Sequence, residues 1–139
     1  MKPDIKFLHS IFEVSHVEYQ SYDLTSQKLI FSSGVASQLL GYSPEQYAGF
    51  SNHYFKELVH PDDRQRVEET IRKIYHAKDQ EIVEMTVRMR RADGAYCWLY
   101  SRQMILDRAH DGKHCAVIRV AEDITDFKEL QAKLFDKVS

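Results

Sequence analysis

The hydrophobic positions of this chain change their spacing several times, and each change predicts a different element. In residues 3–13 they recur every three or four positions, as on one face of an amphipathic helix, at Ile5, Leu8, Ile11 and Phe12. Residues 17–24 and 28–32 are rich in Tyr, Val, Ile and Phe, and Thr25-Ser26-Gln27 separates them. We therefore expect an N-terminal helix followed by a β-hairpin.

Helical spacing returns between residues 35 and 75. Residues 35–40 precede Gly41, which suits the left-handed end of a helix, and Ser43-Pro44-Glu45-Gln46 can form a capping box. His60-Pro61-Asp62-Asp63 opens a longer helix, because proline fits the first turn and aspartates favour the positive end of the helix dipole. The expected core face of that helix consists of Val67, Ile71, Ile74 and Tyr75.

A period of two marks the strands expected in the last part of the chain. It is clearest in residues 82–91, where Val83, Met85, Val87 and Met89 alternate with polar residues. Asp93-Gly94 predicts a tight hairpin into a strand at residues 96–106, and His110-Asp111-Gly112 predicts a second turn into a strand at 114–120. A terminal helix follows, with Phe127, Leu130 and Leu134 on its apolar face.

Two strands, a group of helices and three long strands predict an α+β domain. We expect a five-stranded antiparallel sheet with helices on one face, flanked by N-terminal and C-terminal helices. The order of elements excludes a doubly wound nucleotide-binding fold, which needs alternating strands and helices and a glycine-rich turn after the first strand.

Composition narrows the class of protein. The chain has 139 residues with 19 Lys and Arg against 21 Asp and Glu, so it is long enough for one domain and lacks the basic excess typical of nucleic-acid binding. No apolar stretch is long enough to cross a membrane, and the N-terminus does not resemble a secretory signal, so we expect an intracellular protein. Cys97 and Cys115 are not spaced as a disulfide framework or a zinc site, and we interpret both as reduced core residues.

Four motifs follow one another along residues 16–125. They are Leu40-Gly41-Tyr42-Ser43-Pro44-Glu45, Leu58-Val59-His60-Pro61-Asp62-Asp63-Arg64, Arg90-Arg91-Ala92-Asp93-Gly94 with Trp98 soon after, and Asp123-Ile124-Thr125. In this order they resemble the PAS sensor domains. The resemblance is closest to the branch that is frequent in bacterial sensor kinases and cyclic-dinucleotide enzymes such as diguanylate cyclases.

This resemblance implies a curved five-stranded sheet, a helical side that encloses a small cavity, and a C-terminal helix that carries a signal to an effector. It divides the chain into a flanking helix at 1–14, a PAS domain at 15–125 and the start of an output helix at 126–139. No kinase, cyclase or phosphodiesterase motif fits in the remaining residues. We therefore expect a cytoplasmic sensory or relay module of two-component or cyclic-dinucleotide signalling, either a fragment or a stand-alone protein, and not an enzyme.

The sequence offers little support for a cofactor site. The resemblance offers His76, at the end of the long helix, as a haem ligand, but a solvated histidine at the helix end is the favoured interpretation. The cysteine segment of photoactive flavin domains is absent, which leaves non-covalent flavin as an alternative. His60 is explained by the helix start and receives no catalytic role. The sequence therefore identifies no cofactor and no metal.

An enzyme with a similar arrangement of helices and sheet is an alternative to a sensory domain. Cone-shaped isomerases and dehydratases also pack helices on a curved antiparallel sheet, and they use a buried Asp with Tyr donors. In this chain the carboxylates fall at helix starts, hairpins and strand positions interpreted as exposed, where capping, turns and solvation account for them. A carboxyl group with a strongly raised pKa inside a pocket would be needed to favour such an enzyme.

The resemblance assigns signal relay to Asp123, Ile124 and Thr125. In PAS domains this triplet links the last strand to the output helix, with the Asp paired to a basic side chain and the Thr bonded near the junction. Arg90 or Arg91 is the expected partner, because guanidinium and carboxylate form paired charge-assisted bonds. The alternative is an ordinary helix cap.

The flanking helices and the cavity leave two hypotheses open. The apolar faces of the two helices predict a homodimer, although either helix could instead dock on the sheet. The cavity, expected between the sheet and residues 35–75, belongs either to a small-molecule sensor or to a ligand-free dimerisation and relay module. In both cases the partner is a linked or separate kinase or cyclase.

Overall fold

The computed structural model describes residues 5–108 and 115–138 of the chain. In chain order the elements are α1 (Ile5–Ser15), β1 (Glu18–Asp23), β2 (Lys28–Ser32), α2 (Val35–Leu40), α3 (Pro44–Gly49), α4 (Asn52–Phe55), the 3₁₀ turn η1 (Pro61–Asp63), α5 (Arg64–Tyr75), β3 (Val83–Arg90), β4 (Tyr96–Arg108), β5 (Cys115–Asp123) and α6 (Thr125–Val138).

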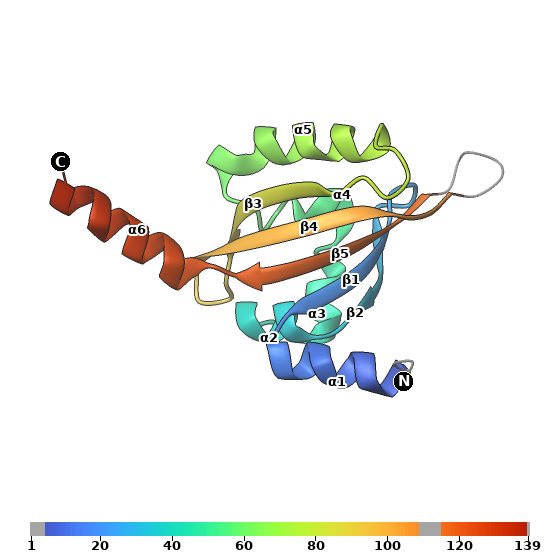
Figure 1. Cartoon of the computed structure of the whole chain (residues 1–139), viewed down its shortest axis with the longest axis horizontal. Helices are drawn as coiled ribbons and strands as arrows, with labels where there is room; N and C mark the ends of the chain where they lie inside the picture. The colour runs from blue at the N-terminus through green and yellow to red at the C-terminus, as the bar shows by residue number, and fades with distance from the viewer. Residues whose placement is uncertain (1–4, 109–114, 139) are drawn as a thin grey trace.

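The five strands form one antiparallel sheet in the order β2-β1-β5-β4-β3. The last strand of the chain therefore lies in the middle, between β1 and β4, and β2 and β3 are the two edges. This arrangement confirms the α+β fold with a five-stranded antiparallel sheet. It also places the end of β5 beside β1 and β4 just before the chain enters α6 (Figure 1).

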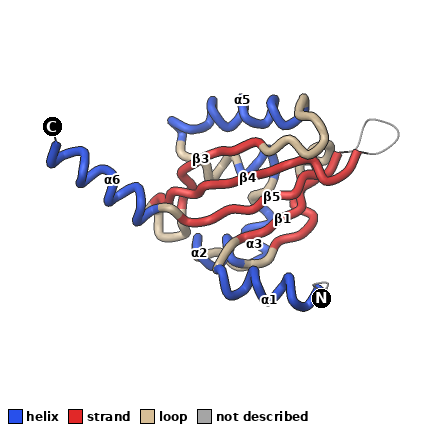
Figure 2. The backbone as a smooth tube through the Cα atoms, viewed as in Figure 1, coloured by secondary structure: helices blue, strands red, loops and turns tan. Residues whose placement is uncertain are grey.

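The core lies between the inner face of the sheet and the helices from α2 to α5. Strand residues of one parity, such as Tyr22, Val87 and Val117, are buried against helical residues such as Leu40 and Ile74. Burial of such apolar side chains is the main favourable term in folding, at roughly 25 cal/mol per Å². Figures 1 and 2 show α6 extending away from the sheet, whereas α5 lies along β3.

Most of the predicted starts and turns are confirmed. Gly41 ends α2 at φ 83°, in the left-handed region that glycine adopts without strain. Ser43 accepts from the Gln46 amide while the Gln46 side chain accepts from the Ser43 amide, which is the expected capping box. The hairpin at Gly94 and the predicted pair of strands β1 and β2 are also present.

Some expectations were wrong in detail. Tyr75 does not belong to the core face of α5, because it is 42% exposed and only its hydroxyl reaches inward, donating to the Leu24 carbonyl oxygen. Strands β4 and β5 extend two and three residues beyond their predicted ends, since each pairs with neighbours along nearly its whole length. The short α4 was not predicted. The predicted turn at His110-Asp111-Gly112 lies outside the described residues.

Residues 58–66 cover the exposed edge of β3. The Arg90 amide donates to the Leu58 carbonyl, the His60 amide donates to the Arg88 carbonyl, and the Arg66 guanidinium donates to the Thr86 carbonyl. An open strand edge offers unpaired backbone groups to other chains. The segment that leads into α5 therefore satisfies this edge and fixes α5 beside it.

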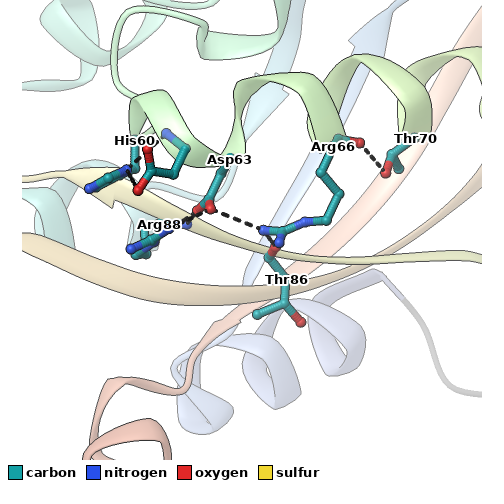
Figure 3. A network of polar contacts seen from close by, with 7 residues as sticks. His60, Asp63, Arg66, Thr70, Thr86 and Arg88 are labelled. Carbon is teal, nitrogen blue, oxygen red and sulfur yellow. Dashed lines mark hydrogen bonds and ion pairs between the residues drawn. The ribbon is translucent and has the colours of Figure 1, made fainter.

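Asp63 is the centre of this covering segment (Figure 3). Its carboxylate accepts from the Arg88 amide at 2.9 Å, from Arg88 Nε at 3.1 Å and from Arg88 Nη2 at 2.7 Å, and Arg66 Nη2 lies 3.5 Å away. Both aspartates lie in the first turn, as predicted, but the sequence interpretation missed the partners of the Asp63 side chain. The Asp63 side chain is buried and holds a strand residue, whereas Asp62 is exposed.

The two arginines determine the charge state of Asp63. Burial raises its pKa, but the bonds from Arg88 and the charges of Arg66 and Arg88 outweigh burial and hold the pKa below the usual 3.8. A carboxyl group whose pKa is lower in the folded state stabilises the fold above its unfolded pKa and loses that contribution as the pH falls.

We expect Asp63→Asn to lower the free energy of unfolding by about 2–3 kcal/mol at neutral pH, because it removes a buried acceptor of charge-assisted bonds. The difference in unfolding free energy between the variant and wild type should shrink as the pH falls below about 4, because the wild type then loses the contribution of its ionised Asp63 carboxylate. Urea unfolding at several pH values measures both effects. Asp62→Asn, one residue away and exposed, is the matched control and should change stability little; equal effects of the two variants would contradict this account.

Candidate functional site

The inner face of the sheet carries a cluster of buried polar side chains. Its members are Glu18 and Gln20 on β1, Ser101 and Gln103 on β4, and Arg119 on β5. Each is at most 7% exposed. Buried charges are rare unless they are paired or hydrogen-bonded, so the partners of each member decide what the cluster can do.

Glu18 is saturated by donors. Its carboxylate accepts from Gln20 Nε2 at 2.8 Å, Ser33 Oγ at 2.7 Å, the Ala36 amide at 3.1 Å and the Ser32 hydroxyl. An ionised carboxylate is acceptor-only, and all four partners donate. Glu18 therefore ties β1 to the end of β2 and to the first turn of α2 without needing a cation in direct contact.

Gln20 connects Glu18 to Arg119. Its Nε2 donates to Glu18 and to the Tyr47 hydroxyl, and its Oε1 accepts from Arg119 Nη1 at 3.2 Å. Because the carboxylate of Glu18 only accepts and the guanidinium of Arg119 only donates, these two contacts fix the orientation of the amide. The positive and negative charges in the core are thus linked through a neutral amide.

Arg119 is held by two amide oxygens and two rings. Its Nε donates to Gln103 Oε1 at 3.0 Å and its Nη1 donates to Gln20 Oε1. The guanidinium carbon lies 5.5 Å from the Tyr22 ring centroid and 4.9 Å from the Tyr54 ring centroid. Aromatic faces attract guanidinium ions, and the effect grows when water is excluded.

Two buried atoms of this cluster, Arg119 Nη2 and Gln103 Nε2, and the hydroxyl of the neighbouring Tyr54 have no hydrogen-bond partner within the described part of the chain. Burial raises the pKa of Tyr54 far above its usual range, although Arg119 acts in the opposite direction, so the hydroxyl keeps its proton and can donate. All three groups are therefore donors in need of an acceptor. Leaving one such group unsatisfied costs about 1–3 kcal/mol.

A small internal cavity adjoins the cluster, between the sheet and the helices. It measures about 40 Å³ and is lined by Arg119, Gln20 and Ser101 from the sheet and by Tyr47, Tyr54 and Phe55 from the helical side, together with apolar residues. A water molecule needs roughly 10–15 Å³ of such space. The cavity therefore accommodates a group of a few non-hydrogen atoms.

Tyr54 lines both this cavity and a larger cleft. The cleft, of about 260 Å³, lies between α4 and α5 and shares Tyr54, Val59 and Val67 with the cavity lining. The backbone of His53, Tyr54 and Phe55 is left-handed, with φ between 53° and 57°. Non-glycine residues adopt this conformation at a cost, and such strained segments often lie at ligand sites.

The Tyr22 hydroxyl holds the strained segment in place. It accepts from the Tyr54 amide at 3.1 Å and donates to the Ser51 carbonyl at 2.7 Å. The rings of Tyr22 and Tyr54 are 4.4 Å apart. The wall between cavity and cleft is therefore fixed by one side chain of β1, next to Arg119.

The junction at Asp123-Ile124-Thr125 lies at the C-terminal end of the central strand β5. Thr125 accepts from the Trp98 amide at 3.0 Å, and the Ile124 amide donates to the Trp98 carbonyl at 2.9 Å. Asp123 accepts from the Thr125 amide at 2.9 Å and from its hydroxyl. The triplet thus attaches the start of α6 to β4 through both backbone groups of Trp98, beside the pairing of Asp123 with Leu99.

Of the two predicted partners, Arg91 is the one that reaches Asp123, with Nη2 lying 3.9 Å from Oδ2. Arg91 Nη1 also donates to the Leu39 carbonyl in α2 at 3.3 Å. Arg90 is the last residue of β3. Its amide donates to the Leu58 carbonyl, and its carbonyl accepts from the Tyr42 hydroxyl. Arg91 therefore links α2 to the junction.

The remaining candidate residues lie apart from the cavity. His76 is exposed at the end of α5 and does not line the cavity. His60 accepts from the Asp62 amide through Nδ1, in keeping with its structural interpretation. Cys97 is fully buried, and burial raises its pKa to about 11, whereas Cys115 is only half-buried.

The apolar faces of the two flanking helices are exposed to solvent. On α1 the exposed fractions of Ile5, Leu8 and Ile11 are 76%, 46% and 44%, and the side chain of Phe12 lies outside the described residues. On α6 Phe127, Leu130 and Leu134 are each more than half exposed. Of these side chains, those that the structure describes are each at least 44% exposed.

Sequence reasoning missed the polar cluster. The expectation that the carboxylates occupy helix starts, hairpins and exposed strand positions is wrong for Glu18, which is 2% exposed on the inner face. The alternation of strands carried the signal: Glu18 and Gln20 have the parity of Tyr22, and Arg119 has the parity of Val117. Hydrophobicity alone could not detect residues that are buried although polar.

Membrane-spanning helices and metal-binding clusters are the next features to consider in the described residues. None of the helices in residues 5–108 and 115–138 is both long and apolar enough to span a membrane. Over the same residues, no group of three or more His, Cys, Asp or Glu side chains is arranged to hold a metal ion.

Comparison with known proteins identifies the fold. A family model described as PAS fold matches residues 29–121. A search of curated proteins gives no match. Among solved structures, a sensory box histidine kinase/response regulator from Burkholderia thailandensis E264 is similar, with a TM-score of 0.73, 18% identity, and coverage of 94% of this chain and 93% of that chain.

Two further structures are similar over most of the domain. The N-terminal domain of a diguanylate cyclase with PAS/PAC sensor from Marinobacter aquaeolei has a TM-score of 0.64 and 18% identity, covering 78% of this chain and 95% of that chain. The PAS-B domain of Drosophila melanogaster Cycle, solved with bound ethylene glycol, has a TM-score of 0.64 and 19% identity, covering 76% and 98%. At these identities the likeness concerns the fold.

We expect Glu18→Gln to lower the free energy of unfolding by about 2–4 kcal/mol, because one carboxylate oxygen becomes an NH₂ group that faces donors in the core. Thermal and urea unfolding measure the change. Glu84→Gln on β3 is the control, since Glu84 is exposed and its partner Arg102 lies 3.9 Å away on the surface. Equal stabilities of Glu18→Gln and wild type would show that the buried carboxylate has no structural role.

Proposed function

Since this chain belongs to the PAS fold family, we propose that it is a sensory module that binds a small molecule in the core cavity and passes the change to α6. The role is regulatory, and turnover of the bound molecule is not part of it. The fold is that of domains in sensor histidine kinases and diguanylate cyclases, so the proposed effector is an enzyme of one of these classes, either linked to this chain or separate from it.

One observation carries the proposal. Three buried groups that can donate, on Arg119, Gln103 and Tyr54, have no acceptor within residues 5–108 and 115–138, and two of these residues, Arg119 and Tyr54, line the cavity. Folded proteins satisfy most buried polar groups, and the exceptions are often sites for an ion, a water or a ligand. A core that served only packing would favour apolar side chains at these positions, because an uncompensated buried cation is costly.

A continuous chain of contacts supports a route from the cavity to the output helix. Glu18, linked to Arg119 through Gln20, accepts from the first turn of α2 at Ala36. The last turn of α2 accepts from Arg91, which lies beside Asp123. Movement of α2 on ligand binding would therefore change the Arg91–Asp123 contact where α6 begins. Such a route is a hypothesis until coupling is measured.

The exposed apolar faces of α1 and α6 support a homodimer as part of the same function. Apolar side chains that cover nothing in their own chain often pack against a second copy, and two-fold pairing is the commonest arrangement. A ligand-free dimerisation and relay module is the second candidate function, and these exposed faces are the observation that favours it.

We expect native mass spectrometry of the protein purified from its own host to show a dimer that carries additional non-covalent mass. The denatured mass gives the reference, and an absorption spectrum of the same sample tests for haem or flavin. A ligand that binds only the folded state should also raise the melting temperature. A dimer without cargo, indifferent to metabolite libraries, would favour the relay module, and a monomer that is unchanged by removal of residues 1–14 would contradict dimerisation.

We expect Asp123→Ala to uncouple sensing from output while folding stays nearly intact, because the Asp123 side chain is about a third exposed and its contacts lie at the junction. The measurement is the signal of a chimera in which this chain controls a histidine kinase or a cyclase. Asp126→Ala, in the exposed first turn of α6, is the control. Unchanged regulation in the Asp123 variant would refute a relay role for the triplet.

A further inference from the structure

The chemistry of the cavity points to the class of ligand, an inference that rests on the proposed function. The three unsatisfied groups are an arginine nitrogen, an amide nitrogen and a buried tyrosine hydroxyl. Arginine and the amide nitrogen only donate. The missing partner is therefore a group made of acceptors, and not a donor such as an amine.

Charge favours an anion over a neutral acceptor. Arg119 is permanently charged, and its two known bonds go to neutral amide oxygens. Glu18 is the carboxylate of the same buried network, but its oxygens are occupied by four donors and Gln20 lies between it and Arg119. The guanidinium therefore lacks a directly bonded counter-ion among the described residues. Charge-assisted bonds are roughly twice as strong as neutral ones.

Size and access favour a carboxylate with a short apolar chain. The cavity of about 40 Å³ has room for a carboxylate group beside Arg119 but not for a larger body. The adjoining cleft of about 260 Å³ continues past Tyr54 along Val59, Val67 and Ile71. A shift of the Tyr54 side chain would join the two spaces, and this residue belongs to the left-handed segment.

The charged side chains that line the outer cleft are mostly basic. Lys56, Arg64 and Arg72 line it with a single carboxylate, Glu68. A cleft with an excess of one charge raises the local concentration of ligands of the opposite charge. The route that ends at Arg119 is therefore suited to anions.

We infer that the ligand is a small organic monocarboxylate, whose carboxylate accepts from Arg119 Nη2 and from the Tyr54 hydroxyl while its apolar chain lies along Val59 and Val67. Gln103 holds the guanidinium through Nε and offers its own amide nitrogen beside it. The binding is non-covalent and reversible.

The test compares straight-chain monocarboxylates, from acetate to octanoate, with their primary amides by calorimetry and thermal shift on the full chain. At least one carboxylate should bind and raise the melting temperature, and the matching amide should bind about tenfold more weakly or worse. Equal binding of acid and amide would overturn the inference that the ligand is a carboxylate, while the sensory function stands. A bound molecule whose mass identifies it as a neutral compound would do the same. Failure of every compound to bind, with no cargo in native spectra, would overturn both.

Variants separate recognition from folding. Tyr54→Phe removes a hydroxyl that lacks a partner and keeps the ring beside Arg119, so the unliganded melting temperature should not fall while affinity for the carboxylate drops several-fold. Arg119→Met should abolish the preference for acid over amide. Arg102→Met, on the exposed face of β4, is the control and should bind as wild type does. Wild-type affinity in both Tyr54→Phe and Arg119→Met would overturn the inference.

Discussion

A guanidinium buried in the core, with no carboxylate of residues 5–108 or 115–138 in direct contact, is the constraint around which the inner face of this domain is organised. The charge of Arg119 cannot be removed by deprotonation, so the structure surrounds it with two amide oxygens and two tyrosine rings. The Gln20 amide makes further bonds to Glu18 and Tyr47. The result is a connected polar network in which Arg119 and Tyr54 carry unsatisfied groups, within the described residues, and line the cavity.

The same network reaches the parts of the fold that lie outside the core. Glu18 joins β1 to the first turn of α2, and the last turn of α2 is joined through Arg91 to Asp123. On the outer side, Arg88 is held by Asp63, and Arg88 and Lys128 of α6 each lie 4.9 Å from the Trp98 ring centroid. Trp98 also bonds Ile124 and Thr125. Core and edge contacts therefore meet at the start of α6.

The sequence was sufficient for the architecture and for the junction. Period, turn chemistry and caps predicted the strands and most helices, and the PAS resemblance predicted that a basic residue, Arg90 or Arg91, accompanies Asp123. Side-chain direction and buried polarity could not be predicted in the same way. Asp63 fits a helix start and yet its side chain binds Arg88 of β3. Tyr75 fits an apolar stripe and yet is 42% exposed. Glu18 and Arg119 are buried, with distant partners that satisfy them. These outcomes depend on contacts between residues far apart in the chain, which local pattern does not contain.

The central claim is that occupation of the cavity changes the contacts at the start of α6. Hydrogen exchange of the Ile124 and Lys128 amides, which donate to Trp98 and Ile124 respectively, measures this directly in the presence and absence of a binding carboxylate. The account predicts a change in protection of both amides in the wild type, and loss of that change in Arg91→Gln with binding retained. Unchanged protection of both amides in a saturated wild-type sample would contradict it.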